Sequence, residues 1–299
     1  MQKVFIQNRK GQKVAVVVDV PAHPPEADQS GKLAFVMHGL GGFKEQPHIE
    51  VMAKVFLEHG YTVVRFDTTN TFGESDGQYE EATTTNYYED LEDVIGWAAR
   101  LSQNLTAVRF WDSSAQPQPW YQEPFVLAGH SLGGLCVALY GERHPEKVKA
   151  LAPIGTVVSG KLSMEGHAKD EEWRKWKETG WRTTHSVSNP DAIKRLPWSH
   201  MEDRLKYDLL APFSPPARGG DKEGVGVGGG RMTDRLTMPT LLVVGEKDES
   251  CPPEHQKILY AALPGTRELH IISGAPHTFR EPVHLEEFAR VIGQWLTKI

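Results

Sequence analysis

The sequence predicts an α/β fold in which helices flank a mostly parallel, twisted sheet and one long segment is inserted over that sheet. Short runs rich in β-branched residues alternate with helical patterns along most of the chain. This alternation stops over residues 156–238 and then resumes. With 299 residues, the chain is long enough to form one large domain with a substantial buried core.

The part of the chain before residue 156 contains the first series of strands and helices. Residues 3–8 and 13–20 are separated by a short polar turn, so we expect them to form a β-hairpin. Further strands are expected at residues 33–39, 61–67, 125–129 and 149–155. Helices are expected at about 47–58, 87–101 and 131–143, where apolar residues recur at helical spacing.

Residues 156–238 interrupt this order with scattered prolines, a charged stretch rich in tryptophan and the Gly-rich run 219–230. We therefore predict that residues 1–155 and 239–299 form the core domain and that 156–238 form an inserted cap or lid. The Gly-rich run has few side chains that could pack, so we expect it to be flexible. The tryptophans are expected to hold this cap together: Trp173, Trp176, Trp181 and Trp198.

The chain after residue 238 returns to the α/β pattern. Strands are expected at residues 240–245 and 268–273, with a helix at about 253–263 between them. A last helix is indicated by an apolar face that consists of Leu285, Phe288, Ala289, Ile292 and Leu296.

Composition and charge exclude several classes of protein. The net charge of −6 is spread along the chain, and no Lys/Arg stripe suggests nucleic-acid binding. The polar N-terminus lacks the apolar core of a secretory signal, and no apolar run approaches the ~18 residues of a membrane span. The two cysteines, Cys136 and Cys251, are too few for a disulfide framework. We expect a cytoplasmic protein with neither a nucleic-acid nor a membrane partner.

A candidate nucleophile, Ser131, lies in the sequence Gly-His-Ser-Leu-Gly directly after an expected strand. In a Gly-x-Ser-x-Gly turn, a strained backbone lifts the serine hydroxyl clear of the sheet, and residues two positions away must be small. Gly129 and Gly133 meet this requirement. The pattern alone would also fit a tightly packed turn or a phosphate cradle at a helix N-terminus.

A serine hydroxyl needs a base to accept its proton, and the base must itself be oriented. Asp248 follows one buried strand and His277 follows the next, in the order Ser, acid, His. Because the carboxyl ends of parallel strands meet at one edge of a sheet, these three residues are expected to converge. Glu246 and Glu249 are rival candidates for the acid.

Acyl transfer also needs hydrogen-bond donors for the developing oxyanion. The strand at 33–39 ends in a His-Gly-Leu-Gly-Gly sequence, where Leu40 offers its backbone N–H. The second donor would be the N–H of Leu132, the residue after the candidate nucleophile. His38 is expected to brace this loop rather than act as a base.

Five stretches in this order, HGLGG, RFDTTNTFGESDG, GHSLGG, GEKDESCPP and GAPHTF, resemble the α/β-hydrolase family. The resemblance runs from about residue 33 to the end and is weakest over the insertion. Within the family, the chain is similar to the cinnamoyl (feruloyl) esterase-like and serine-aminopeptidase-like hydrolases.

This resemblance implies the α/β-hydrolase fold with Ser131 as nucleophile, His277 as base and Asp248 as the orienting acid. It also implies that Leu40 and Leu132 are the oxyanion donors. Asp67 and Ser75 would brace the loop after the fourth sheet strand. The chain departs from the family pattern in the long segment 109–123 and in the Gly-rich tail of the insertion.

These observations predict a serine hydrolase that cleaves small carboxylic esters, aromatic or of short to medium acyl chain length, through an acyl-enzyme. The same triad could serve a peptidase or amidase, a thioesterase, an acyltransferase or a carbon–carbon hydrolase. A non-catalytic scaffold is the alternative from another class. No metal or cofactor motif occurs, so we expect neither.

Overall fold

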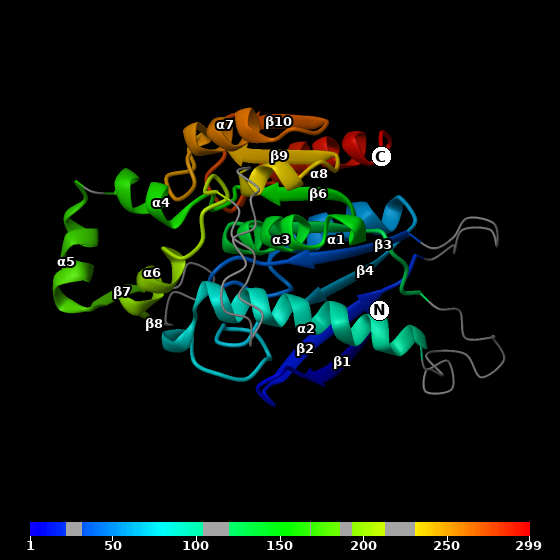
Figure 1. Ribbon diagram of the computed structural model, residues 1–299, viewed down its shortest axis with the longest axis horizontal. Coiled ribbons are helices and arrows are strands. Elements are labelled where there is room, and N and C mark those ends of the chain that lie inside the picture. Colours follow the sequence, from blue (N-terminus) through cyan, green and yellow to red (C-terminus); the bar gives the residue numbers. More distant parts are fainter. Residues whose placement is uncertain (22–31, 104–119, 168, 186–192, 213–230) are drawn as a thin grey trace, which may run out of the picture.

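One eight-stranded sheet forms the centre of the molecule in a computed structural model that describes residues 1–21, 32–103, 120–167, 169–185, 193–212 and 231–299 (Figure 1). The strand order is β1-β2-β4-β3-β5-β6-β9-β10. β1 pairs antiparallel with β2, and β2 pairs antiparallel with β4. All the other neighbouring strands of this sheet run parallel. The predicted N-terminal hairpin and the mostly parallel sheet are both confirmed.

The core elements follow the order expected from the sequence. The strands are β1 (Gln2–Gln7), β2 (Lys13–Asp19), β3 (Lys32–Met37), β4 (Tyr61–Phe66), β5 (Phe125–His130), β6 (Val148–Ile154), β9 (Thr240–Gly245) and β10 (Arg267–Ile272). The helices that cover them are α1 (Pro47–Glu58), α2 (Thr84–Gln103), α3 (Leu132–Arg143), α7 (Pro253–Ala262) and α8 (Pro282–Leu296).

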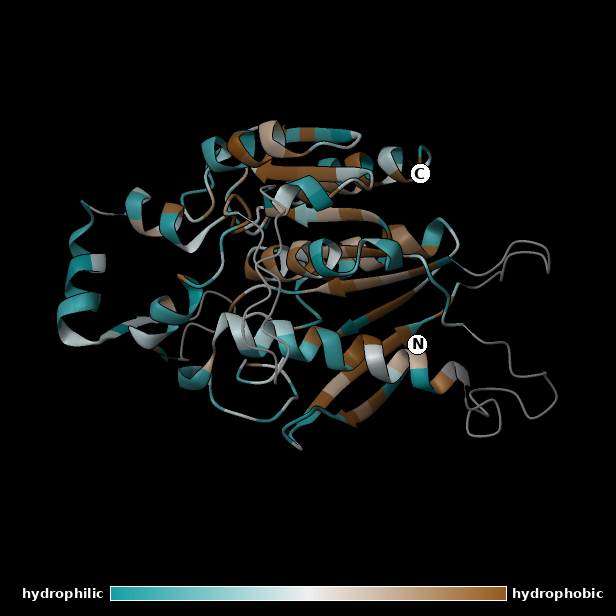
Figure 2. Cartoon of the chain, in the orientation of Figure 1, coloured by the Kyte–Doolittle hydropathy of each residue, from teal (hydrophilic) through white to brown (hydrophobic). Residues whose placement is uncertain are grey.

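Alternating side chains of the strands divide the apolar core into two layers, one on each face of the sheet. On β3, Phe35 and Met37 contribute to one layer, whereas Ala34 and Val36 contribute to the other. Both faces of the central strands are therefore apolar, as Figure 2 shows by their brown colour. Burial on both faces explains why these strands read as continuous apolar runs in the sequence.

Each core layer is completed by its own helices. Apolar residues of α1 and α8, such as Phe56 and Phe288, belong to one layer. Those of α2 and α3, such as Leu91 and Leu139, belong to the other. Full burial of such a side chain contributes about 1.5–3 kcal/mol, so these contacts stabilise the sheet that carries the candidate site.

The first turn of α2 lies earlier in the chain than the sequence pattern indicated. The helix begins at Thr84, not at about residue 87. The Asp203 carboxylate accepts hydrogen bonds from the backbone N–H and the hydroxyl of Thr85, at 2.9 and 2.7 Å. This residue lies in the distant segment 156–238, so its contribution to the helix start had no local sequence signal.

The described part of segment 156–238 forms α4 (Gly160–Gly166), α5 (Glu171–Thr179), the hairpin β7 (Trp181–His185) and β8 (Ile193–Pro197), and α6 (Ser199–Arg204). In Figure 1 these elements lie beyond the arrowheads of the parallel strands. That place would suit a cap, and the division into core and cap stays a prediction. The Gly-rich run 219–230 and most of 109–123 lie outside the described residues.

Three of the four tryptophans in this segment pack on one another. The Trp176 ring, only 2% exposed, lies between Trp173 and Trp198, with ring centroids 5.4 and 5.3 Å away. Trp181 instead remains 43% exposed. The small aromatic cluster therefore holds α5 and the start of α6 together. The other residues of α5 are mostly hydrophilic, as Figure 2 shows by their teal colour.

A buried ion pair joins the loop after β3 to the loop after β4, and Ser75 links the second loop to β2. The side chains of Lys44 and Asp67 are both fully buried, and Lys44 Nζ lies 2.8 Å from Asp67 Oδ2. Ser75 Oγ donates to the Asp67 carbonyl and accepts from the N–H of Ala15 on β2. Burial would lower the pKa of Lys44, but its hydrogen bonds to Asp67 and Glu74 raise it above the usual value.

We predict that Asp67→Ala lowers the free energy of unfolding by about 3–5 kcal/mol, because it leaves the buried Lys44 ammonium without its one fully buried carboxylate partner. Asp76→Ala is the matched control, since Asp76 is exposed and pairs with the exposed Lys13. Urea unfolding of the wild-type protein and both variants measures the difference. Equal losses in the two variants would contradict this role for the buried pair.

Candidate active site

Ser131 lies at the sharp turn between β5 and α3. Its backbone has φ = 57° and ψ = −119°, which is strained for a residue that carries a side chain. The Ser131 N–H donates to the carbonyl of Ile154 on the neighbouring strand, and the Val157 N–H donates to the Ser131 carbonyl. These bonds hold the turn, so the strained conformation is supported by the sheet itself.

Close backbone packing explains two of the glycines around this turn. A Cβ on Gly133 would lie 2.4 Å from the carbonyl oxygen of His38. A Cβ on Gly39 would lie 2.8 Å from the Cβ of Ser131. The loop after β3 and the turn after β5 therefore approach each other as closely as only glycine permits.

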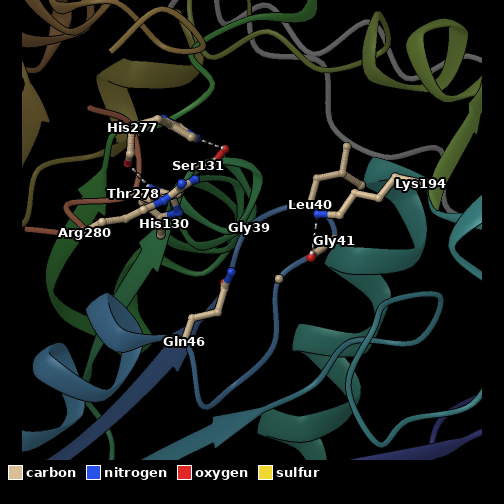
Figure 3. Close-up of a pocket in the computed structure, with 11 residues that line it drawn as sticks. Gly39, Leu40, Gly41, Gln46, His130, Ser131, Lys194, His277, Thr278 and Arg280 are labelled. Atoms are coloured by element: carbon tan, nitrogen blue, oxygen red, sulfur yellow. Dashed lines mark hydrogen bonds between the residues drawn. The ribbon is translucent and has the colours of Figure 1, made fainter. Parts of the chain in front are cut away.

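The structure brings Ser131, His277 and Asp248 together in hydrogen-bond contact, and Figure 3 shows the bond between Ser131 and His277. Ser131 Oγ lies 2.9 Å from His277 Nε2, and His277 Nδ1 lies 2.7 Å from Asp248 Oδ2. The other carboxylate oxygen of Asp248 accepts the backbone N–H groups of Ser250 and Cys251. Asp248 is fully buried, whereas 22% of the His277 side chain is exposed, so Asp248 is held rigidly and His277 is open to the pocket.

The rival acids point elsewhere. Glu246 is exposed and accepts hydrogen bonds from the Ser273 hydroxyl and the Gly274 N–H. These bonds lower the pKa of Glu246 below its usual value. Glu249 is likewise exposed. Among the three acidic residues of this loop, Asp248 forms the hydrogen bond to His277.

The loop after β3 is braced from several sides. Tyr87 Oη accepts the N–H of Gly41 at 3.0 Å, and the Thr71 hydroxyl donates to the Gly42 carbonyl. His38 Nε2 accepts the N–H of Thr68 at 3.0 Å, which leaves Nδ1 to donate to the Gly39 carbonyl. Burial lowers the pKa of His38, so this bracing ring is neutral at neutral pH.

Two buried histidines, His130 and His48, pack behind the candidate base His277. His130 Nε2 donates to the His277 carbonyl at 2.8 Å, and the two rings lie 4.6 Å apart. The His48 ring packs against His130 at 4.3 Å. Burial lowers the pKa of His130 well below its usual value and that of His48 to about 3. Both rings are therefore uncharged at neutral pH and add no charge to His277.

A pocket opens directly over these groups (Figure 3). It is lined by Gly39, Leu40, Gly41, Gly42, Gln46, His130, Ser131, Lys194, His277, Thr278 and Arg280. The candidate oxyanion donor Leu40 therefore faces the same space as Ser131. Leu132 follows Ser131 directly at the start of α3. The catalytic role of both donors stays a prediction.

Sequence reasoning missed the pocket residues His130, Lys194 and Arg280. His130 adjoins the serine and Arg280 closely follows His277, so proximity to predicted site residues was an available signal. Lys194 belongs to the β7–β8 hairpin, which no expected element covered. Its place in the pocket depends on how that hairpin packs, for which the sequence holds no local signal.

No helix within the described ranges is long and apolar enough to cross a bilayer. The described residues also contain no cluster of three or more His, Cys, Asp or Glu side chains arranged to hold a metal ion.

The fold and the arrangement of this site define the chain as an α/β-hydrolase. A family model described as "Serine aminopeptidase, S33" matches residues 29–282, and the chain belongs to this family. The family name describes the group as a whole and does not by itself assign a substrate to this member.

Comparison with known proteins supports a hydrolase of the esterase kind. An uncharacterised 31.7 kDa protein from Escherichia coli is 24% identical over 92% of this chain and 93% of its own length. A mouse mitochondrial palmitoyl-protein thioesterase, ABHD10, is 27% identical over 64% of this chain and 50% of its own. The solved structure of Est1E from Butyrivibrio proteoclasticus with ferulic acid has a TM-score of 0.72, at 20% identity, and covers 99% of this chain and 98% of its own.

We predict that Asp248→Asn lowers kcat/KM on the order of 10³- to 10⁴-fold, because an amide favours the wrong tautomer of His277. Glu246→Gln and Glu249→Gln should change the rate little, since both side chains are exposed and make no bond to His277 in the structure. Initial rates on a short 4-nitrophenyl ester measure all three variants. A larger loss at either glutamate than at Asp248 would move the orienting role to that residue.

Proposed function

We propose that this hydrolase cleaves carboxylic esters through an acyl-enzyme formed on Ser131. The observation that supports this most directly is the chain of hydrogen bonds from Ser131 Oγ to His277 Nε2 and from His277 Nδ1 to Asp248. A serine hydroxyl that faces an oriented imidazole can lose its proton as it attacks an acyl carbon.

In the first half of the reaction, Ser131 Oγ attacks the ester carbonyl and His277 Nε2 accepts the hydroxyl proton. Asp248 stabilises the imidazolium that forms. The negative charge that develops on the carbonyl oxygen is met by the backbone N–H groups of Leu40 and Leu132. His277 then returns the proton to the leaving alcohol as the ester bond breaks.

In the second half, water attacks the acyl group on Ser131 and His277 takes a proton from it. The tetrahedral intermediate collapses, His277 gives the proton back to Ser131 Oγ, and the carboxylic acid leaves. The buried neutral rings of His130 and His48 suit this cycle, because they support His277 without a fixed positive charge beneath it.

Small esters, including aromatic ones, are the substrates that the surroundings of the pocket favour. α5, in the proposed cap, is hydrophilic on its outer face, which does not suit docking to a lipid surface. Thioesters are the second candidate, because the 27% identical relative ABHD10 is named a palmitoyl-protein thioesterase. Cleavage of a thioester would use the same serine, base and oxyanion donors.

Ser131→Ala should lower kcat for a short 4-nitrophenyl ester on the order of 10⁴-fold or more, because it removes the covalent acceptor. Ser250→Ala is the matched control: Ser250 is exposed and contacts Asp248 through its backbone N–H, so its hydroxyl is dispensable. Circular dichroism verifies that both variants fold. Near-native rates in Ser131→Ala would refute the proposed nucleophile.

A further inference from the structure

Two cationic side chains, Lys194 and Arg280, line the pocket that contains Ser131 and His277. In Figure 3 they reach the pocket from opposite sides of the view, Lys194 beside Leu40 and Arg280 beside Thr278 and His130. Neither forms an ion pair with a carboxylate of the described residues. Lys194 Nζ contacts the Gly41 carbonyl at 3.4 Å, and Arg280 Nε donates to the Thr278 hydroxyl at 2.7 Å.

The β7–β8 hairpin turns a second cation to the same side as Lys194. Arg182 pairs with Leu196 and Thr184 pairs with Lys194, so these four side chains share one face of the two-stranded sheet. That face is the more buried one, whereas Trp181 and Ile193 on the other face are 43% and 58% exposed. The hairpin therefore directs Arg182 and Lys194 inward and Arg195 outward.

Both inward cations lie over aromatic rings. Lys194 Nζ is 5.1 Å from the Phe72 ring centroid and 5.9 Å from that of Tyr79. The Arg182 guanidinium is 4.8 Å from the Trp176 ring centroid. Burial and the nearby charges of Arg280 and Arg182 lower the pKa of Lys194. Contacts with rings thus hold these cations in place without neutralising them.

Arg204, at the end of α6, adds a third cation from the inserted segment. One guanidinium nitrogen donates to His200 Nε2 at 2.7 Å, while the buried Nε has no hydrogen-bond partner among the described residues. Burial and, to a smaller extent, the charge of Arg182 lower the pKa of Arg204 to about 10. Arg204 also lies near Cys251: burial raises the pKa of this thiol, and the charge of Arg204 and a contact with Ser131 oppose that rise only in part.

These four residues, here called the basic cluster, differ from the paired cations of the chain. Lys44, Arg65 and Arg290 each pair with a carboxylate within 3.0 Å. The basic cluster consists of Arg182, Lys194, Arg204 and Arg280. Within the described residues, none of the four forms an ion pair with a carboxylate. Arg182, Lys194 and Arg204 are partly buried, whereas Arg280 is exposed at the rim. Like charges gathered in a partly buried site destabilise the protein unless an anion joins them. The chain as a whole carries a net charge of −6, so this local excess runs against its composition.

We propose that the basic cluster recognises an oxyanionic group, carboxylate or phosphate, on the substrate, so that the natural ester is itself an anion. This inference rests on the proposed ester hydrolysis and narrows its substrate class. Arginine and lysine side chains in a partly desolvated pocket form strong charge-assisted bonds to such groups. The anion would lie under the β7–β8 hairpin while the ester carbonyl reaches Ser131.

The test compares two matched substrates, the mono-4-nitrophenyl ester of adipic acid and the methyl ester of that compound. They differ in one negative charge and carry the same activated ester. The wild-type enzyme should prefer the anionic ester in kcat/KM, and Lys194→Gln should reduce this preference about tenfold. Lys194→Arg should retain most of it. Arg195→Gln, on the outer face of the same strand, should leave the preference unchanged.

The outcomes separate this proposal from the proposed function. Equal kcat/KM values for both esters in the wild-type enzyme, or an equal preference in Lys194→Gln and Arg195→Gln, would overturn the anion site while leaving ester hydrolysis intact. Failure to cleave either ester would instead contradict the proposed function.

Binding can be measured without turnover. Calorimetry of the wild-type protein with glutarate or with inorganic phosphate should show binding that Lys194→Gln and Arg182→Gln weaken, and the tighter of the two ligands identifies the anion. Absence of binding by both ligands would overturn the proposal whatever the enzyme does to esters.

Discussion

The site depends on one constraint, the positive φ of Ser131 at the end of β5. A side chain in this conformation is tolerated only where its surroundings hold it. Here the neighbouring strand β6 accepts the Ser131 N–H, and the loop after β3 packs against the serine through Gly39. The same contact that fixes the serine therefore brings the candidate oxyanion loop beside it.

The parallel arrangement of β5, β6, β9 and β10 adds the remaining groups. Asp248 follows β9 and His277 follows β10, so the order of strands in the sheet brings both to the edge where Ser131 lies. Asp248 is then held by two backbone N–H groups of its own loop and His277 by the ring of His130. Rigid positions of this kind are what acyl transfer requires of an orienting acid and a base.

Much of this arrangement could be predicted from the sequence, because the core strands are buried on both faces and read as clear apolar runs. The strand ends and the glycines around Ser131 then placed the triad candidates at one edge. The β7–β8 hairpin was missed because residues such as Thr183 and Thr184 give its strands no apolar alternation. The start of α2 lies earlier than predicted because Asp203, far along the chain, accepts hydrogen bonds from its first turn. Contacts between distant segments, which local patterns do not encode, account for both differences.

The basic cluster illustrates the same limit at the level of function. Arg182, Lys194 and Arg204 are ordinary charged residues in a charged segment, and Arg280 follows a motif residue without belonging to the motif. The pairing of β7 with β8 turns Arg182 and Lys194 to one face of the hairpin, and Lys194 shares the pocket with Arg280. Arg204 is close enough to Arg182 to feel its charge. We therefore propose that the core of the fold determines the reaction type and that Arg280 and the cations of segment 156–238 determine the substrate preference.

The central claim is that Ser131 is the residue that becomes acylated. The most direct measurement is to treat the folded protein with a fluorophosphonate, digest it and map the modified peptide by mass spectrometry. The account predicts one phosphonate on Ser131 and its disappearance in His277→Ala, where the base that activates the hydroxyl is missing. An unmodified Ser131, or a phosphonate on another residue of the folded protein, would contradict it.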